Sequence, residues 1–489
     1  MAGTKLIGID VGTTAVKAAV FGPDGTVLDR LHQPHDTQRP ESACVEQDAR
    51  DWTRAIDAAL ARFTPLMPGV GGIGLTSQVN THVFVDAEGT PLAPAIVWQD
   101  GRAAAEAAEL DAQISEAQRL EWWGAPMPID ASHALARMLW MQRHHPEIWD
   151  KTRYVLLPKD LCLWHMTGAV VSDPLSNIGL VDLAHRHIPE VLGLVAGAAD
   201  RMAPLKPLSA LAGRVRQGPA QDIPVANGTM DGWVGLLGCG GHREGAASYL
   251  SGTSEILGIT SEAVHPTPGV IVFAESDGLR MHAGPTQAGG AAQMWWADLN
   301  GISPEQMSQR AAASPPDKPA PLFLPHLQGE RAPLWNANAR GAFLGIDQTS
   351  DAADLARSVY EGVAFSVRLL LNALERSAQV QSTELICGGG GFRSDVWNQI
   401  RANVLGRTLH RLAVTDPGLL GAAAIARAAT GQAPDLASAL DELMHIDKTY
   451  RPDPALAPLY DAQFAIFEDL TTRLAPVNDR LTALPRPRL

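Results

Sequence analysis

Cysteine is scarce in this sequence, and its few copies exclude a disulfide-stabilised fold. The four residues Cys44, Cys162, Cys239 and Cys387 show no redox or metal-ligand spacing, which is typical of reduced thiols in a cytoplasmic protein. No uncharged apolar run reaches the roughly 20 residues of a membrane span. The N-terminus leads directly into a strand and leaves no room for a signal peptide. We therefore expect a soluble, cytoplasmic protein with no membrane partner.

Positive charge is also in short supply. Lysine and arginine number 39 against 53 acidic residues, a net charge of −14 that argues against a nucleic-acid partner. An acidic protein can still bind a nucleotide, because magnesium and backbone amides neutralise the phosphates. The composition is otherwise globular, with 46% hydrophobic and 19% charged residues. Since 489 residues are too many for one core, we expect two domains of more than about 200 residues each.

The N-terminal stretch predicts a strand, a tight turn and a second strand. Apolar residues lead to Asp10, after which Gly12 supplies backbone freedom and Thr13 and Thr14 add two hydroxyls. The amides and hydroxyls of such a hairpin can hold phosphate oxygens, and the acid can hold the water shell of a magnesium ion. A hairpin without any ligand explains this stretch equally well when it is taken alone.

A second hairpin of the same kind begins near residue 247. Its turn is Gly252, Thr253 and Ser254, 240 residues after Gly12. The repeat indicates two similar half-molecules that each present a phosphate loop to a shared cleft. It argues against Rossmann and P-loop enzymes, whose glycine loops open a helix and not a hairpin.

Two polar segments in the first half predict a site for a polyol. They contribute Gln78, Val79, Asn80, Trp98, Asp100 and Arg102. Sugar hydroxyls pair with amide, carboxylate and guanidinium groups, while the C–H face of a sugar packs on an indole. Taken alone, Trp98 is better explained as a core residue.

An acid and a glycine run complete the candidate site. Asp231 follows a short strand and precedes the second hairpin, where a catalytic base would lie, although an N-cap of the following helix is the alternative role. Further on, a buried strand enters Gly388, Gly389 and Gly390, part of a run of four glycines. Backbone without side chains lets a flat adenine or ribose lie close, and a structural turn is the alternative.

Together these stretches resemble the FGGY carbohydrate kinases, and the motifs are most similar to those of the xylulokinases. Residues 341–361 match the family's C-terminal signature, and residues 98–102 and 323–331 fall in register with xylulokinases. The similarity runs from Lys5 to about Gly431.

Two segments depart from the family pattern. The first signature expects Ser, Thr or Pro and then Lys where this chain has Ala134 and Arg137. Xylulokinases carry Met-His, and glycerol kinases Arg-Glu, where this chain has Val79 and Asn80. The second difference touches the sugar pocket.

The resemblance implies an α/β protein of two actin-like (ribonuclease H-like) domains flanking a deep catalytic cleft. Residues 1–241 would form the N-terminal FGGY domain, mainly sugar-binding, and residues 242–489 the C-terminal FGGY domain, mainly ATP-binding. It further implies ATP-dependent phosphorylation of a sugar hydroxyl, of a ketopentose such as D-xylulose, with magnesium.

The resemblance also assigns roles to single residues. Asp231 matches the catalytic base, and Asp10 the acid that positions magnesium, through water. The other matching positions are Gly12, Thr13, Thr14, Gly252, Thr253 and Ser254 for the ATP phosphates, Gly388, Gly389 and Gly390 for adenosine, and Gln78, Val79, Asn80, Trp98, Asp100, Arg102 and Asp231 for the sugar.

Two further functions are compatible with these motifs. A kinase for another pentulose, a tetritol or a related polyol would carry all of them. An actin-like ATPase that serves as a conformational switch would carry the same phosphate hairpins, but it would not need the polar sugar cluster. The sequence leaves the oligomeric state open, with a homodimer as the assembly to test.

Overall fold

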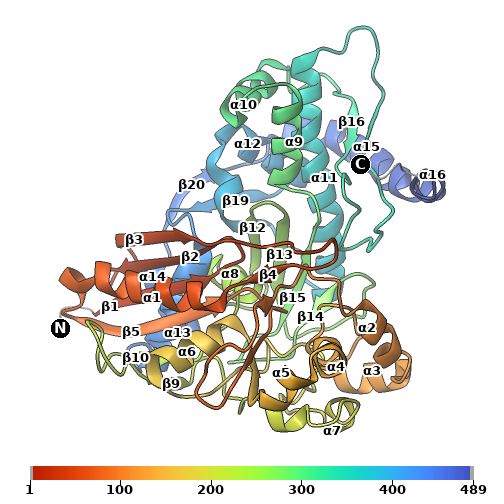
Figure 1. Ribbon diagram of the computed structural model, residues 1–489. Coiled ribbons are helices and arrows are strands. Elements are labelled where there is room, and N and C mark those ends of the chain that lie inside the picture. Colours follow the sequence, from red (N-terminus) through yellow and green to blue (C-terminus); the bar gives the residue numbers. More distant parts are fainter. Residues whose placement is uncertain (1–3, 485–489) are drawn as a thin grey trace. The chain divides into compact units, whose positions relative to one another are not determined.

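The computed structural model describes residues 4–484, which form two compact units (Figure 1). The first unit comprises the chain up to Gly238 together with Ala274–Gly278 and Gly418–Met444. The second comprises Cys239–Phe273, Leu279–Pro417 and the chain from His445 onward. The first unit thus takes in a segment from late in the sequence, and a domain boundary between residues 241 and 242 stays a prediction.

A seven-stranded mixed sheet forms the centre of the first unit. Its order is β3-β2-β1-β5-β10-β9, and β11 also pairs with β5, nearer to the C-terminal end of β5 than β10 does. The strands are β1 (Lys5–Val11), β2 (Ala15–Phe21), β3 (Val27–Pro34), β5 (Val70–Ser77), β9 (Leu211–Arg214), β10 (Pro224–Ala226) and β11 (Thr229–Met230). The apolar side chains of β1 are fully buried, because this strand lies between β2 and β5 and helices cover both faces of the sheet.

Helices cover this sheet closely. Helix α1 (Ala49–Arg62) begins at the N-cap Asp48 and buries one apolar face against β2 and α6 (Pro158–Thr167). Helix α13 (Pro417–Ala429) approaches the sheet backbone itself, because a Cβ at Gly8 or Gly74 would lie about 2 Å from a carbonyl oxygen of α13. The alanine-rich helix α13 therefore packs tightly against the sheet.

The rest of the first unit consists of helices and two short strand pairs. These are β4 (Glu46–Gln47) with β7 (Ala95–Ile96), β6 (Val83–Val85) with β8 (Tyr154–Leu156), α2 (Ala104–Asp111), α3 (Glu116–Trp123), α4 (Ala134–His144), α5 (Pro146–Lys151), α7 (Pro189–Leu192), α8 (Asp231–Gly238) and α14 (Leu436–Leu443).

The second unit is built on another seven-stranded mixed sheet. Its order is β14-β15-β13-β12-β18-β19-β20. The strands are β12 (Ala247–Ser251), β13 (Glu255–Thr260), β14 (Ile271–Val272), β15 (Met281–Pro285), β18 (Glu384–Gly388), β19 (Thr408–Leu412) and β20 (Ile446–Tyr450). The long helix α11 (Ala352–Ala378) packs on β13 and β15, and α12 (Asp395–Leu405) packs on β19 and β20.

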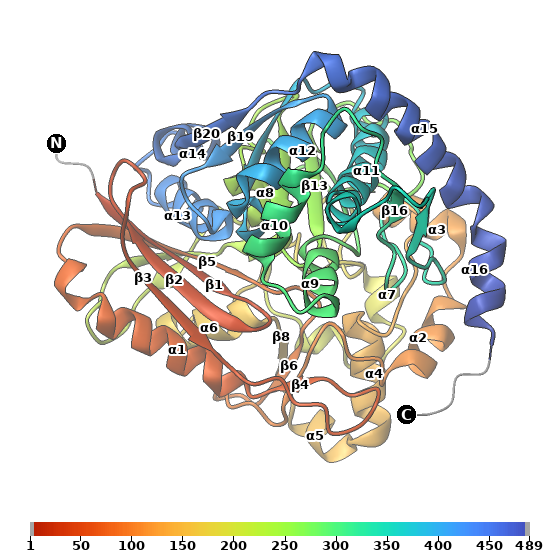
Figure 2. The same cartoon turned by 90° about the horizontal axis from the view of Figure 1, so that it is seen from above.

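Further elements of the second unit lie around α11 (Figure 2). They are the pair β16 (Leu322–Leu324) and β17 (Ala342–Leu344), and the helices α9 (Gly290–Leu299), α10 (Pro304–Ala313), α15 (Ala457–Arg473) and α16 (Ala475–Thr482). In the part of the chain from residue 4 to 484, no helix is both long and apolar enough to cross a membrane.

The two sheets repeat one topology. In each, an antiparallel hairpin (β1-β2 and β12-β13) lies beside a parallel strand (β5 and β18), then a second parallel strand and an antiparallel edge strand. This repeat confirms the expectation of two similar halves. The fold is a two-unit α/β architecture with mixed sheets and helices.

Candidate functional site

The first unit gathers several predicted site residues at one edge of its sheet. Thr76 of β5 pairs with Asp10 of β1 and with Thr229 of β11, so these three residues are level across the sheet. The three strands end one residue later, and the next residues of the chain are Gly12, Gln78 and Asp231. The strands run in parallel, so the predicted phosphate turn, the polar segment and the candidate base leave the sheet at the same edge.

Hydrogen bonds with Ala15 and His35 hold the turn at Gly12. The Gly12 amide donates to the Ala15 carbonyl (3.1 Å), and His35 Nε2 lies 3.1 Å from the Gly12 carbonyl oxygen. Gly12 does not have a positive φ, which differs from the expected use of its backbone freedom. Its missing side chain instead leaves room for the Ala15 carbonyl oxygen, which would lie only 3.2 Å from a Cβ at position 12. Burial lowers the pKa of His35.

A buried glutamine, which the sequence did not single out, joins the turn to the polar segment. Gln47 Nε2 donates to the Thr13 carbonyl (2.7 Å), and Gln78 Nε2 donates to Gln47 Oε1 (2.9 Å). Gln78 Oε1 is buried and accepts no hydrogen bond from the described residues. This leaves an acceptor beside the turn that a ligand hydroxyl can satisfy.

Trp98 is not a core residue. Its side chain is 40% exposed, and its indole Nε1 donates to Thr13 Oγ1 (3.0 Å). Its backbone amide donates to Thr81 Oγ1 (3.1 Å). The structure therefore brings the predicted indole platform next to the predicted phosphate turn.

Asp100 and Arg102 are bound to each other. The buried Asp100 carboxylate accepts bonds from the Val45 amide (2.6 Å) and from Arg102 Nη2 (2.8 Å), and Arg102 also donates to Glu46 Oε1 (2.7 Å). Burial alone would lower the pKa of Arg102, but the bonds to Asp100 and Glu46 outweigh it and raise that pKa. In this structure Asp100 orients Arg102, and direct contact of either residue with a sugar stays a prediction.

Arg137, one of the departures from the family pattern, supports the segment around Asn80. Its guanidinium donates to the carbonyls of Asn80, Ile96 (2.9 Å) and Val97 (2.6 Å). Asn80 has a φ of +52° and donates from Nδ2 to Ser132 Oγ (3.1 Å). Burial lowers the pKa of Arg137 to about 9. Arg137 thus holds together the two polar segments that were predicted to bind a sugar.

Asp231 is the first residue of α8. Its Oδ1 accepts a bond from the Gly232 amide (2.7 Å), which is a contribution to capping. Burial raises its pKa to about 6, more than the bond to Gly232 lowers it. A carboxylate with a pKa near neutrality is suited to general base catalysis.

Behind this edge lies a buried charge cluster, which the sequence did not predict. Lys159 Nζ lies 2.7 Å from Asp160 Oδ1 and 2.9 Å from Asp173 Oδ2, and Thr229 Oγ1 donates to Asp173 Oδ1 (2.5 Å). Burial opposes the charge of Lys159, but the two carboxylates outweigh it and raise the pKa of the ammonium. The cluster ties α6 to the strand that leads into Asp231.

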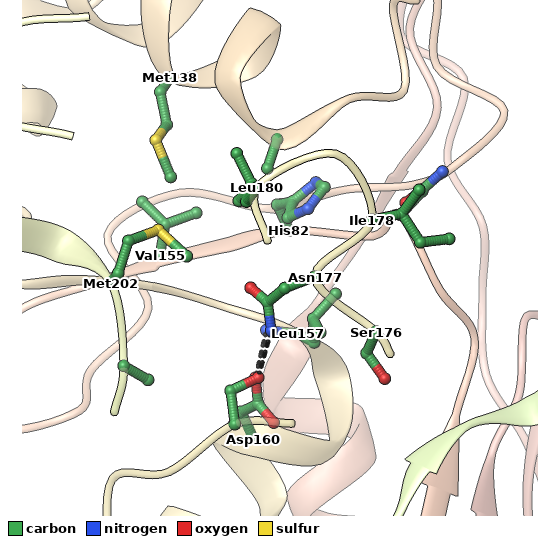
Figure 3. A pocket seen from close by; sticks show the side chains of 14 residues that line it. His82, Met138, Val155, Leu157, Asp160, Ser176, Asn177, Ile178, Leu180 and Met202 are labelled. Atoms are coloured by element: carbon green, nitrogen blue, oxygen red, sulfur yellow. Dashed lines mark hydrogen bonds between the residues drawn. The ribbon is translucent and has the colours of Figure 1, made fainter. Parts of the chain in front are cut away.

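A cavity beside this cluster is too small for a sugar. Figure 3 shows that both polar and apolar side chains line it; those labelled include Asp160, Ser176 and Asn177, and Met138, Val155, Leu180 and Met202. Its volume of about 10 Å³ corresponds to roughly one water molecule. The predicted sugar residues other than Asn80 do not line it.

In the second unit, the hairpin of Gly252, Thr253 and Ser254 rests on the first turn of α9. The carbonyls of Gly252 and Thr253 accept bonds from the amides of Gly290 (2.9 Å) and Ala291 (3.0 Å). A Cβ at Gly290 would lie 2.5 Å from the Gly252 carbonyl oxygen, so glycine is needed for this approach.

The glycine run lies against the same hairpin. Leu250 of β12 pairs with Gly388 of β18, and a Cβ at Gly389 would lie 2.3 Å from the Ser251 carbonyl oxygen. Gly389 also has a φ of +99°, so a structural role explains this glycine. Around Gly390 the space is open: among the described residues, none beyond its two chain neighbours has an atom within 4 Å of a Cβ built there. Gly390 is therefore the position where a ligand can lie against bare backbone.

Both domain models of one family match the chain. The N-terminal domain model of the FGGY family of carbohydrate kinases matches residues 5–238, and the C-terminal domain model matches residues 247–430. The chain belongs to the FGGY family of carbohydrate kinases. It is an enzyme, a carbohydrate kinase of the xylulokinase-like kind, and kinases of this family use ATP as the phosphoryl donor.

Known relatives cover the FGGY chain almost end to end. Xylulose kinase of Escherichia coli is 30% identical over 96% of this chain and 99% of its own length. The structure of a xyloylose kinase from Brucella ovis matches with a TM-score of 0.87 and 28% identity over 97% of this chain and all of the other. A xylulose kinase from Rhodospirillum rubrum matches with a TM-score of 0.85 and 27% identity, over 97% and 100% of the two chains.

Proposed function

We propose that this kinase transfers the γ-phosphoryl group of ATP to a hydroxyl of a ketopentose, with D-xylulose as the first candidate. The observation that carries the proposal is the shared sheet edge, where the phosphate turn, Gln78 and Asp231 directly follow three aligned strands. The names of the similar kinases point to the same substrate class.

Asp231 is the general base in this proposal. With a pKa of about 6 it is ionised at neutral pH, so it can accept the proton of the attacking hydroxyl late in the transfer. Its bond from the Gly232 amide fixes one carboxylate oxygen and leaves the other to face the substrate.

ATP and magnesium fit the residues present. When bound, they would supply the phosphoryl group and the positive charge that offsets the phosphates. We assign magnesium to Asp10 through water. The open space at Gly390 suits adenosine, and Gly388 and Gly389 would complete that contact. The phosphates would be held by Gly12, Thr13, Thr14, Gly252, Thr253 and Ser254.

The sugar contacts belong to the first unit. The buried Gln78 Oε1 has no partner among residues 4–484 and offers an acceptor to a hydroxyl. Asn80 offers an amide, and Trp98 offers an exposed indole face. The further positions assigned to the sugar are Val79, Asp100 and Arg102. Accordingly, residues 1–241 would be mainly sugar-binding and residues 242–489 mainly ATP-binding.

A substrate panel tests the proposal. ADP release is measured with D-xylulose, other pentuloses, hexuloses, tetritols and glycerol, and with no sugar as the baseline. We expect the highest kcat/KM with D-xylulose. A tetritol or hexulose preferred by tenfold, about 1.4 kcal/mol, would contradict the ketopentose assignment.

The same panel distinguishes a ketopentose kinase from a polyol kinase and from an actin-like switch. Tetritols and further polyols are included because Val79 and Asn80 differ from the xylulokinase pattern. ATP hydrolysis that no sugar stimulates, together with ATP-dependent sedimentation as a polymer, would instead indicate an actin-like switch. The cytoplasmic location and the homodimer stay predictions.

A further inference from the structure

A buried ion pair lies directly under the two predicted nucleotide loops of the second unit. Arg401 of α12 and Glu255 of β13 are both 0% exposed, and Arg401 Nη2 lies 3.0 Å from Glu255 Oε1. Glu255 is the residue that follows the Gly252–Ser254 turn. Neither side chain is accessible to a ligand, so neither can be a catalytic residue.

Arg401 connects three separate chain segments. Its Nη2 also donates to Ser251 Oγ (2.8 Å), and its Nη1 donates to the Gly391 carbonyl (2.8 Å). Ser251 Oγ in turn donates to Glu255 Oε1 (3.0 Å). The residues on both sides of the hairpin turn and the end of the glycine run are therefore bonded to one guanidinium.

Aromatic rings fix the position of this guanidinium. Its carbon lies 3.8 Å from the ring centroid of Trp397 and 4.5 Å from that of Phe392. A lysine at this position could place a charge near Glu255, but it lacks the planar fork that reaches Gly391 and Ser251 together. The geometry requires arginine.

We propose that Arg401, paired with Glu255, is a positioning residue that sets the distance between the phosphate hairpin and the adenosine loop. This inference rests on the proposed function, because it takes both loops to be the nucleotide site. Arg401 acts through Ser251 and Gly391, and it does not touch the nucleotide. Loss of the fork lets the two loops move apart, so the phosphates and the adenosine of one nucleotide no longer fit both at once.

The test compares Arg401→Lys with Arg357→Lys in the full-length protein. Arg357 is a matched control, since it is 2% exposed and its Nε lies 3.1 Å from Glu361 Oε1. It donates to the carbonyls of Pro315 and Lys318, which lie outside both nucleotide loops. Binding of ADP is measured by calorimetry, and KM is measured separately for ATP and for the sugar.

We expect Arg401→Lys to raise the Kd for ADP and the KM for ATP by about tenfold or more and to leave the KM for the sugar unchanged. Arg357→Lys should leave the Kd for ADP and the KM for ATP within about twofold of the parent. This should hold even if its melting temperature falls as much as that of Arg401→Lys. Equal ADP affinity in Arg401→Lys and the parent would overturn the inference.

A second variant keeps the test decisive if Arg401→Lys does not fold. Ser251→Ala removes only the hydroxyl that bonds Arg401 and Glu255, and it should raise the Kd for ADP several-fold with folding retained. Unchanged ADP affinity in this variant counts against the inference. If the parent itself binds no ADP, the proposed function is wrong. If the parent binds ADP and the variants bind it equally well, only the role of Arg401 is wrong.

Discussion

At the scale of single residues, burial decides what the candidate base can do. Asp231 is partly screened from solvent at the start of α8, and the cost of burying its charge raises its pKa to about 6. The Gly232 amide opposes this shift by donating to Oδ1. The outcome is a carboxyl group that titrates close to the pH at which a kinase works.

Asp231→Asn separates the catalytic from the capping role. Asparagine is nearly isosteric and can accept the Gly232 bond, but it cannot take a proton. We expect kcat to fall roughly 10²–10⁴-fold while sugar and ADP affinities stay unchanged. Initial rates and calorimetry on one purified variant check this. Turnover within a few-fold of the parent would exclude Asp231 as the base, and Asp10 would be the next residue to test.

The pH dependence gives an independent check on the same residue. A base must be ionised, so activity should rise with pH through about 6 and level off above it. Since the folded-state pKa lies above the ordinary value of 3.8, the folded protein binds the proton more tightly, and stability falls as pH rises from about 4 to about 6. Asp231→Asn removes this loss, so its melting temperature should exceed that of the parent at pH 7 and not at pH 4.

At the scale of elements, the loop after β18 uses its glycines for different purposes. Gly389 and Gly391 lie so close to Ser251 that a side chain would collide with it, whereas the space at Gly390 is open. The packing of β12 against β18 thus explains two glycines and leaves a third for a ligand.

Gly390→Ala tests that division. We expect it to weaken ADP binding by about tenfold, because a methyl group would occupy the face assigned to adenosine. Its melting temperature should stay close to that of the parent. Gly391→Ala is the contrasting variant, since its Cβ would lie 1.9 Å from Ser251 Oγ and should lower the melting temperature itself. Full ADP affinity in Gly390→Ala would move the adenosine site elsewhere.

At the scale of the whole molecule, the first unit is not one continuous piece of sequence. Helix α13 comes from residues 417–429, yet it lies on β1 and β5 through the close approaches at Gly8 and Gly74. Leu420 and the alanines of its middle turn are fully buried. The N-terminal half therefore depends on a late segment for part of its core.

Fragments of the chain should show this dependence. We expect residues 1–241 alone to unfold at a lower urea concentration than the same fragment joined to residues 418–444 through a flexible linker. Without α13 the apolar face of β1 and β5 is exposed to water. Circular dichroism during urea titration measures both midpoints, and equal midpoints would show that α13 contributes nothing to the stability of the first unit.

The sequence by itself determined the local elements and the residue types of the site. Asp10 to Thr14, Gly252 to Ser254 and Gly388 to Gly390 could be recognised because hairpins and glycine loops are local, and their residues are neighbours in the chain. The repeat of the hairpin predicted two similar halves, which the two sheets confirm.

Only the tertiary structure decided which distant residues support these loops. Arg401 lies 146 positions from Glu255, and Gln47 lies 31 from Gln78, so no spacing in the sequence pairs them. Trp98, which alone suggested core, is exposed, and its indole bonds Thr13 across 85 positions. Buried charges and amides take whichever partner the folded chain brings within bonding distance, and that choice is made by packing rather than by position in the sequence.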